Sequence, residues 1–305
     1  MRNAFADTIY DLAQVDSRIC VLVADISPAG SMVKFREQFP ERFINTGVAE
    51  QAMIGIAAGL ALAGMRPFCY TIATFSLYRP FEMIRVDLAY QNLPVTVIGM
   101  GAGVIYSTLG GTHHTMEDIA IASAVPNMSV VAPCDPDEMR QMTKWCALES
   151  NGPVYMRLGK SGEPDLTSKL SAPFVPGKIR LIKHGHDMVL LTYGITASMV
   201  LSIAEKLELI GKSVSVVSVH TIKPLDQEGT INILKSYKHV VVIEEHVPHG
   251  GLSSRVKEIA WDISATCRLD TFTLKDNFIH FYGSHNELLK AHGLDQDLII
   301  SQLLK

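Results

Sequence analysis

Charged residues are scarce in this chain, and its cysteines are few and scattered. Asp, Glu, Lys and Arg make up 19% of the 305 residues, the net charge is −4, and no run of basic residues occurs. Nucleic acid and anionic membranes are therefore poor candidates for partners. The five cysteines form no Cys-x-x-Cys pair, which is typical of reduced core residues in a cytosolic protein. Hydrophobic residues reach 48%, which favours an oligomer or a member of a complex.

Long apolar segments and the common nucleotide and metal motifs are also missing. No uninterrupted apolar run of about 18 residues occurs, and the start of the chain lacks the apolar region of a signal peptide. We therefore expect a cytoplasmic protein. There is no Walker motif, no His-Glu-x-x-His, no Gly-x-Ser-x-Gly and no Cys/His metal spacing. Gly99, Gly101 and Gly103 follow an apolar run, but Val104 breaks the Gly-x-Gly-x-x-Gly spacing, so dinucleotide binding is set aside.

Apolar β runs alternate with helical patterns along most of the chain. Strands are expected at 20–24, 43–44, 68–72, 95–98, 129–132, 154–157, 188–192, 214–219, 239–243 and 269–274. This alternation predicts an α/β fold with mostly parallel sheets flanked by helices. Between 159 and 178 the periodicity fails, and Gly, Pro, Ser and Lys accumulate. We predict two consecutive α/β domains, 1–160 and 181–305, joined by a linker at 161–180.

One carboxylate, Glu50, stands at the head of a segment that is otherwise small and apolar. Residues 44–51 read Ile-Asn-Thr-Gly-Val-Ala-Glu-Gln, and the pattern from 49 onward predicts a helix with one apolar stripe formed by Ala52, Ile56, Ala57, Leu60 and Ala61. A helix that is apolar all round is usually buried, and a dry setting would favour the protonated form of Glu50. The alternative is a first-turn carboxylate that complements the helix dipole.

The loops after the predicted strands carry further candidates, because ligands of α/β sheets bind beyond the carboxyl ends of the strands. Phe75 and Tyr78 could sandwich a planar heterocycle, although such pairs more often belong to the core. Residues 110–114, Gly-Gly-Thr-His-His, could place imidazoles beside a ligand or could simply cap the following helix. Arg157 and Lys160 could bind phosphate or could be solvated surface cations.

Several motifs occur together in one order along the chain. They are Gly47-Val48-Ala49-Glu50-Gln51, the stretch 71–85, Gly111-Thr112-His113 with Glu117-Asp118, Thr221-Ile222-Lys223-Pro224-Leu225-Asp226, and Glu244-Glu245-His246 before Gly250-Gly251. In this order they resemble the transketolase family of thiamine diphosphate enzymes. The likeness is to the C-terminal half of the family, a pyrimidine-binding domain followed by a C-terminal domain, and it covers nearly the whole chain.

The resemblance implies roles for individual residues. Glu50 matches the glutamate that hydrogen-bonds the aminopyrimidine ring of the cofactor and favours its imino form, whose nitrogen removes the thiazolium proton. Phe75 and Tyr78 match aromatic side chains that pack on this ring, and Asp25 matches an acidic residue near the cofactor at the subunit interface. His113 matches a histidine that contacts the substrate and helps proton transfer.

The resemblance also implies three cations for a substrate phosphate. At two positions, however, this sequence departs from the usual pattern of the family. Lys160 and, less closely, Arg157 and Arg2 match the phosphate-binding positions, although Lys160 replaces the more usual arginine and cannot make a bidentate contact. Leu109 stands where the family usually has an acidic residue that reads a sugar hydroxyl. Both changes weaken the expectation of an ordinary ketose phosphate substrate.

The pyrophosphate-binding domain of the family has no counterpart in these 305 residues. The resemblance therefore implies a partner, an N-terminal transketolase subunit that supplies the ligands of the diphosphate and of Mg²⁺. No metal ligand is expected from this chain. The implied assembly is a heterotetramer with two copies of each subunit and with active sites between chains.

These implications give one leading hypothesis. We expect the C-terminal subunit of a split transketolase that transfers a two-carbon ketol unit between sugar phosphates and needs its partner for activity. The β subunit of a 2-oxo-acid dehydrogenase shares the domain order and the glutamate, but the Gly-Thr-His-His loop favours transketolase. The hypothesis that the chain is half of a deoxyxylulose-phosphate synthase is weaker, because enzymes of that family usually consist of one chain. A non-catalytic binding subunit is disfavoured by the joint presence of Glu50, Phe75, Tyr78 and His113.

Overall fold

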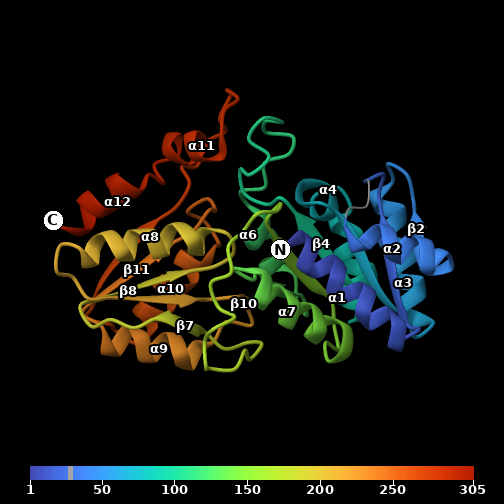
Figure 1. Ribbon diagram of the computed structural model, residues 1–305, viewed down its shortest axis with the longest axis horizontal. Coiled ribbons are helices and arrows are strands. Elements are labelled where there is room, and N and C mark those ends of the chain that lie inside the picture. The colour runs from blue at the N-terminus through green and yellow to red at the C-terminus, as the bar shows by residue number, and fades with distance from the viewer. Residues whose placement is uncertain (27–29) are drawn as a thin grey trace.

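The computed structural model describes residues 1–26 and 30–305, and it contains two α/β units that lie side by side (Figure 1). The first strands along the chain are β1 (Ile19–Val23), β2 (Phe43–Asn45), β3 (Arg66–Ile72), β4 (Thr96–Met100), β5 (Ser129–Val131) and β6 (Val154–Leu158). The later strands are β7 (Arg180–Lys183), β8 (Met188–Thr192), β9 (Val214–Ser218), β10 (Thr221–Lys223), β11 (His239–Ile243) and β12 (Arg268–Phe272).

Helices separate most of these strands. They are α1 (Arg2–Val15), α2 (Ser31–Gln38), α3 (Glu50–Leu62), α4 (Ala73–Leu77), α5 (Phe81–Met83), α6 (Asp118–Ala124), α7 (Pro136–Leu148), α8 (Thr196–Glu208), α9 (Gln227–Ser236), α10 (Leu252–Asp262), α11 (His285–Ala291) and α12 (Gln296–Leu303). A 3-10 turn, η1 (Pro40–Arg42), precedes β2, and a π-helical segment, η2 (Ile84–Tyr90), continues α5. The pattern-based prediction missed β7 and β10.

The described strands form two mostly parallel sheets, which confirms the predicted fold class. The first sheet has the order β10-β5-β6-β4-β3-β1-β2, and its β10–β5 pair is antiparallel while the others are parallel. The second has the order β12-β11-β8-β9-β7, with an antiparallel β7–β9 pair at its edge. Although β10 lies between β9 and α9 in the chain, it completes the edge of the first sheet and so ties the two units together.

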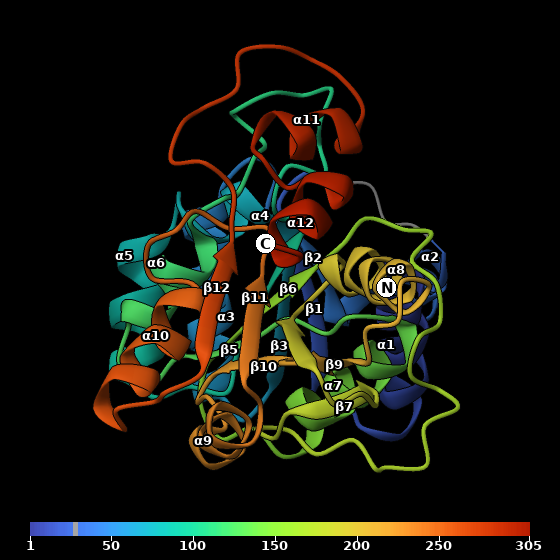
Figure 2. The same ribbon diagram turned by 90° about the vertical axis from the view of Figure 1, so that its left-hand side faces the viewer.

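The central strands are buried on both faces, as parallel strands covered by helices should be. All residues of β1, β4 and β6 are buried, and helices lie on both sides of the sheets (Figure 2). Cys20 and Leu22 of β1 share a core with α3, whereas Ile19 and Val21 share one with α1, because successive side chains of a strand point to opposite faces.

Helix α3 is apolar all round, but only one of its faces is buried. The expected stripe was wrong: Ala57 and Ala61 are buried, whereas Ala52 and Ile56 are exposed and Leu60 is half-buried. The buried face is formed by Met53, Ile54, Ala57, Ala58 and Ala61. Beyond exposed Gln51 in the first turn, no polar residue marks the other face, so periodicity alone could not tell which side of the helix the sheet would cover.

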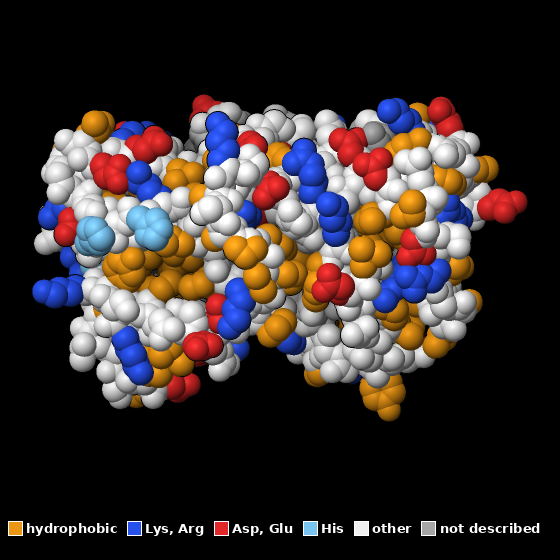
Figure 3. Space-filling model, turned by 60° about the horizontal axis from the view of Figure 1, so that its bottom comes forward, with side chains coloured by type: hydrophobic (Ala, Val, Ile, Leu, Met, Phe, Trp, Pro, Cys, Tyr) orange, Lys and Arg blue, Asp and Glu red, His pale blue; other side chains and the backbone are white. Residues whose placement is uncertain are grey.

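The surface carries exposed apolar side chains between charges of both signs, as the face in Figure 3 shows. The most exposed large ones include Val48 at 71% and Leu62 at 65%, at the two ends of α3. Among residues 1–26 and 30–305, no helix is both long and apolar enough to span a membrane.

Candidate active site

The candidate residues follow neighbouring strands of the first sheet at one edge. Asp25 follows β1, Glu50 begins α3 after β2, Phe75 lies in α4 directly after β3, and His113 lies in the loop after β4. These strands are parallel, so their carboxyl ends meet at this edge. Lys160 follows β6, which pairs with β4 in the same direction. The sheet therefore brings five separate loops to one place.

A tight turn after β2 holds Glu50. The side-chain oxygen of Asn45 accepts the backbone N–H of Asp25 at 3.2 Å and that of Gly47 at 3.0 Å. Gly47 has a φ of +67°, in the left-handed region where glycine is favoured. Glu50 is the first residue of α3, and it is only 3% exposed. The turn thus directs a carboxylate into a nearly dry position.

Arg79, to which the sequence reasoning gave no role, makes the direct contact with Glu50. Its Nη1 lies 2.8 Å from Glu50 Oε1, and its guanidinium carbon lies 4.0 Å from the centre of the Phe75 ring. The Phe75 ring packs edge-on against the imidazole of His113 at 5.1 Å, and His113 packs in the same way against Tyr106 at 5.9 Å. These five side chains form one continuous row, called the site row below.

A cavity of about 560 Å³ adjoins the site row. Phe75, Tyr78 and Arg79 contribute to its wall, together with residues of the loop after β4 and Phe278 of the second unit. The loop after β4 and the segment before α11, which includes Phe278, rise side by side above the sheets (Figure 2). The wall thus combines aromatic rings with parts of both units.

The polar groups of this wall are partly satisfied. The Tyr78 hydroxyl donates to Glu117 Oε2 at 2.8 Å, and burial together with the nearby carboxylates raises the pKa of Tyr78. In contrast, Thr74 Oγ1 and His114 Nε2 are buried in the wall and find no hydrogen-bond partner within the described part of the chain. Unpartnered buried polar atoms are unfavourable, so these two are candidates for contacts with a ligand.

The electrostatic surroundings keep His113 neutral. Burial and the positive charge of Arg79 lower the pKa of His113. Its Nδ1 lies 2.9 Å from Thr112 Oγ1. A neutral imidazole near pH 7 can give or accept a proton at its other nitrogen.

Lys160 lies at the Tyr106 end of the site row, and the charge of Arg2 also acts on Tyr106. Lys160 is exposed, and its Nζ lies 5.3 Å from the centre of the Tyr106 ring. Burial raises the pKa of Tyr106, and the positive charge of Arg2 partly offsets this effect. Two positive groups near one another can receive an anionic group of a ligand.

Arg157 does not reach this site, which corrects its predicted phosphate contact. Its side chain is 4% exposed, and its Nε donates to Asp118 Oδ2 at 2.9 Å. Its Nη2 donates to the carbonyl of Glu245 at 2.9 Å and to that of Thr115 at 3.4 Å. The Tyr155 hydroxyl donates to the same Asp118 oxygen at 2.8 Å. Arg157 is therefore a buried cross-link between the two units.

Known protein families account for both units. The model of the transketolase pyrimidine binding domain matches residues 1–163, and that of the transketolase C-terminal domain matches residues 177–299. The chain belongs to the transketolase family. Its relatives include one of the subunits of the apulose-4-phosphate transketolase of Actinobacillus succinogenes, which is 34% identical over 93% of this chain and 90% of that protein.

Two further similarities are to subunits of transketolases. A 6-deoxy-6-sulfo-D-fructose transketolase subunit of Clostridium sp. (strain MSTE9) is 36% identical over 85% of this chain and 80% of that protein. A solved structure described as a split gene transketolase, inactive beta4 tetramer, is 34% identical over 98% of this chain and 95% of that one, with a TM-score of 0.85. This transketolase chain is thus similar over nearly its whole length to single subunits of transketolases.

Asp25 stands apart from the site row of this transketolase chain. It is exposed, has a φ of +46°, and donates its backbone N–H to Asn45. Residues 27–29, which follow it closely, lie outside the described residues. Its contact with the cofactor therefore stays a prediction that rests on its place after β1.

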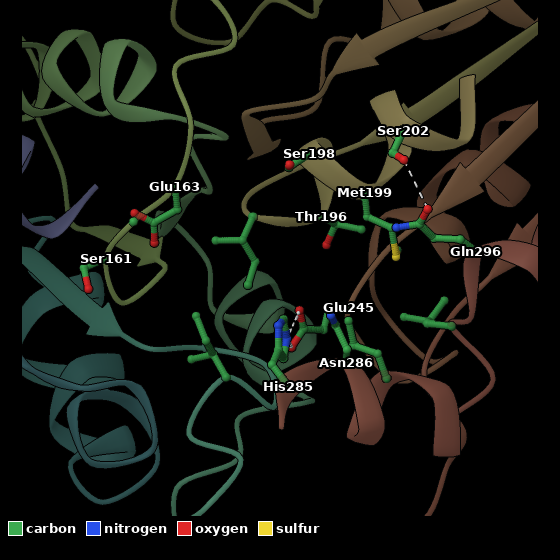
Figure 4. A pocket seen from close by; sticks show the side chains of 15 residues that line it. Ser161, Glu163, Thr196, Ser198, Met199, Ser202, Glu245, His285, Asn286 and Gln296 are labelled. Atoms are coloured by element: carbon green, nitrogen blue, oxygen red, sulfur yellow. Dashed lines mark hydrogen bonds and ion pairs between the residues drawn. The ribbon is translucent and has the colours of Figure 1, made fainter. Parts of the chain in front are cut away.

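A second cavity, of about 350 Å³, lies between the two units of the transketolase chain and is lined by a different set of residues (Figure 4). In it, His285 Nε2 lies 3.0 and 3.1 Å from the two oxygens of Glu245. Glu245 Oε1 also accepts the backbone N–H of Val104 at 2.6 Å. Glu245 thereby connects α11 to the loop that carries His113.

The His285–Glu245 pair predicts a pH-dependent stability. Burial alone would lower the pKa of His285, but the Glu245 carboxylate raises it above its ordinary 6.5. A raised folded-state pKa adds stability below about pH 6.5 that is lost as the pH rises through the folded value. We expect the free energy of unfolding of His285→Gln to lie below that of the wild type near pH 6, and we expect this difference to be smaller at an alkaline pH above the raised pKa of His285. Urea unfolding at both pH values checks this, and a constant gap would contradict it.

Proposed function

We propose that this chain is the C-terminal subunit of a split transketolase and that it transfers a two-carbon ketol unit between sugar phosphates with a partner subunit. The observation that carries this proposal is the buried Glu50 carboxylate, which the Arg79 guanidinium links to the Phe75 ring, in a chain of the transketolase family. The similarity to a relative that is named as one subunit of a transketolase supports the assignment to a two-subunit enzyme.

The residues of the cavity, together with Glu50 of the adjoining site row, fit the pyrimidine half of thiamine diphosphate. A planar ring needs aromatic walls, which Phe75 and Tyr78 provide, and an acceptor for its N–H groups, which Glu50 provides. Thr74 Oγ1 and His114 Nε2 are further polar atoms without partners in the described chain at this wall. Within residues 1–26 and 30–305, no group of three His, Cys, Asp or Glu side chains could hold a metal ion. We therefore assign the ligands of Mg²⁺ and of the diphosphate to the partner subunit.

Each residue of the site has a specific task in this proposal. When bound, thiamine diphosphate supplies the reactive carbon that carries the ketol unit. Glu50 holds a proton at the ring nitrogen that faces it, and its burial keeps water away from this contact. Phe75 and Tyr78 orient the ring. His113, with its neutral imidazole beside Phe75, exchanges a proton with a substrate oxygen, and Lys160 and Arg2 attract the anionic end of the substrate.

We further propose that the substrate is a modified sugar with an anionic end. Leu109, at the position where the family usually has an acidic residue, is 47% exposed in the loop that carries His113. An apolar side chain there offers no acceptor for a sugar hydroxyl. Two relatives are named for apulose 4-phosphate and for 6-deoxy-6-sulfo-D-fructose. Lys160 suits either a phosphate or a sulfonate, because an ammonium acts as a point charge without a preferred planar geometry.

Reconstitution tests the proposed function. The chain is mixed with the N-terminal subunit, thiamine diphosphate and Mg²⁺, and ketol transfer is measured from a panel of phosphorylated and sulfonated ketoses to an aldose phosphate. We expect activity only when both subunits are present. Activity with a 2-oxo acid and a lipoyl acceptor, and none with ketoses, would instead indicate a 2-oxo-acid dehydrogenase. Full activity of this chain alone would overturn the need for a partner.

The outward face of α3 is our proposed contact with another subunit. Gly55 and Gly59 have no heavy atom of the described residues within 4 Å of the position that a Cβ would take, so side chains fit there in the single chain. We expect Gly59→Leu to leave the chain folded, because leucine is also the better helix former. We expect association with the N-terminal subunit to weaken at least about tenfold, because a bulky side chain prevents close helix approach.

Analytical ultracentrifugation of the mixed subunits measures this effect. Asn232→Leu provides the matched control, because it introduces the same side chain at an exposed position of α9 in the second unit. Unchanged association of the Gly59→Leu chain would remove this face of α3 from the interface.

A further inference from the structure

The Arg79 side chain covers the carboxylate on which the proposed cofactor site depends. Its guanidinium donates to Glu50 Oε1 at 2.8 Å and lies 4.0 Å from the centre of the Phe75 ring. The Glu50 side chain is 4% exposed and that of Arg79 is 44% exposed. Arg79 is therefore the more exposed member of a pair whose carboxylate is buried.

A guanidinium group and an aminopyrimidine ring present the same features to these two residues. Both are planar, both stack on an aromatic face, and both can form a hydrogen bond with Glu50, the guanidinium through its N–H groups and the ring nitrogen through a proton that it shares with the Glu50 carboxyl group. We propose that Arg79 occupies, in the cofactor-free chain, the place between Glu50 and Phe75 that the aminopyrimidine ring of thiamine diphosphate takes, so that Arg79 is an internal competitor which the cofactor must displace. This inference rests on the proposed function, because it presupposes that the ring binds at Glu50.

Displacement of Arg79 requires only a side-chain movement. Tyr78, the residue before it, ends α4, and the Arg79 carbonyl oxygen is 3.5 Å from the side-chain amide of Gln51, so its backbone is held by neighbouring elements. Rotation about the flexible bonds of the side chain returns the guanidinium to water without moving that backbone. Arg79 belongs to the wall of the 560 Å³ cavity, so its departure widens the entrance next to Phe75.

The exchange keeps Glu50 paired at every stage. A buried carboxylate without a partner is strongly unfavourable, and Arg79 prevents that state in the cofactor-free chain. When the guanidinium leaves, the Glu50 carboxylate takes up a proton from water and shares it with the ring nitrogen, so that a new hydrogen bond replaces the lost one. Arg79 thus protects the free subunit and, for the same reason, opposes the first step of cofactor uptake.

Removal of Arg79 should therefore have opposite effects on two measurements. In the reconstituted complex, Arg79→Ala is expected to bind thiamine diphosphate about fivefold more tightly. This factor corresponds to the loss of one partly exposed ion pair, the pair between Arg79 and Glu50 that stabilises the cofactor-free state. In the isolated chain, the same substitution is expected to lower the thermal midpoint of unfolding, because it removes the guanidinium that pairs with Glu50. If Arg79 merely supported the site, its removal would weaken the binding of thiamine diphosphate and would also lower the thermal midpoint.

The experiment combines calorimetric titration of thiamine diphosphate with Mg²⁺ into the complex and thermal unfolding of the isolated chain. Arg79→Lys keeps the charge but loses the planar stacking group, so its affinity is expected to fall between wild type and Arg79→Ala. Arg85→Ala is the matched control, because Arg85 is exposed and its ion pair with exposed Glu82 spans 3.8 Å. We expect Arg85→Ala to have the wild-type affinity for thiamine diphosphate and the wild-type thermal midpoint.

Two outcomes would overturn the inference, and they are distinguishable. Equal or weaker binding of thiamine diphosphate by Arg79→Ala, with normal binding by wild type, would show that Arg79 is no competitor and would leave the proposed function intact. A wild-type complex that binds no thiamine diphosphate would overturn the proposed function and this inference with it.

Discussion

Glu50→Gln is expected to lower the turnover of the reconstituted enzyme at least about a hundredfold. Glutamine has nearly the same shape as glutamate, so the turn after β2 and the start of α3 should form as before. It cannot, however, hold or release a proton at the ring nitrogen of the cofactor. The measurement is kcat for ketol transfer with saturating thiamine diphosphate, which removes any effect of weaker cofactor binding from the comparison.

The same substitution separates the catalytic role of Glu50 from its alternative role at the helix terminus. A first-turn carboxylate that only complements the helix dipole contributes about 0.3–1 kcal/mol to stability and nothing to turnover. Glu82→Gln is the control, because Glu82 is 73% exposed at the beginning of α5 and lies outside the site row. Near-normal turnover of Glu50→Gln, together with a small loss of stability, would assign Glu50 to the helix terminus alone.

The arrangement of the site could be predicted because a parallel sheet collects the ends of its strands. Once β1 to β4 were expected as parallel strands, the loops that carry Glu50, Phe75 and His113 had to share one edge, whatever their separation in the sequence. The structure connects these three side chains through ring contacts of 5.1 Å and 4.0 Å, the second by way of Arg79. Their chemistry on the cofactor stays a prediction.

The sequence could not predict toward which partners the long side chains of Arg79 and Arg157 would point. Arg79 follows α4, which was not expected, and Arg157 lies in β6, which was. Arg79 turns to a buried carboxylate on α3, and Arg157 turns to Asp118 on α6. Their partners lie 29 and 39 residues away in the sequence. No local periodicity reports such a pairing, because it depends on where the sheet places distant helices. The spacing of Phe75 and Arg79, four residues apart, was the one available hint for a stacked cation.

The strand β10 escaped prediction for a related reason. Residues 221–223 are too short to show alternation, and their partner is β5 of the first sheet rather than a neighbour along the chain. The outer face of α3 is a comparable case, since Gly55 and Ile56 carry no polar group that would distinguish them from the residues buried opposite them. In both, contact with another element decides which residues are paired or buried, and a helix or strand pattern carries no information about that contact.

Arg157→Leu should have the largest effect on stability, a loss of about 3–5 kcal/mol in the free energy of unfolding. Leucine takes the guanidinium away from the buried Asp118 carboxylate, and it removes the bonds to the Thr115 carbonyl and to the Glu245 carbonyl, the second of which joins the two units. Lys160→Leu is the matched control. Because Lys160 is exposed, the free energy of unfolding of Lys160→Leu should stay within about 0.5 kcal/mol of the wild-type value. The KM of this variant for an anionic sugar should rise. Urea unfolding of the two isolated variant chains distinguishes the structural role of Arg157 from the substrate-binding role of Lys160. A stable Arg157→Leu chain with a raised KM would return Arg157 to the substrate site.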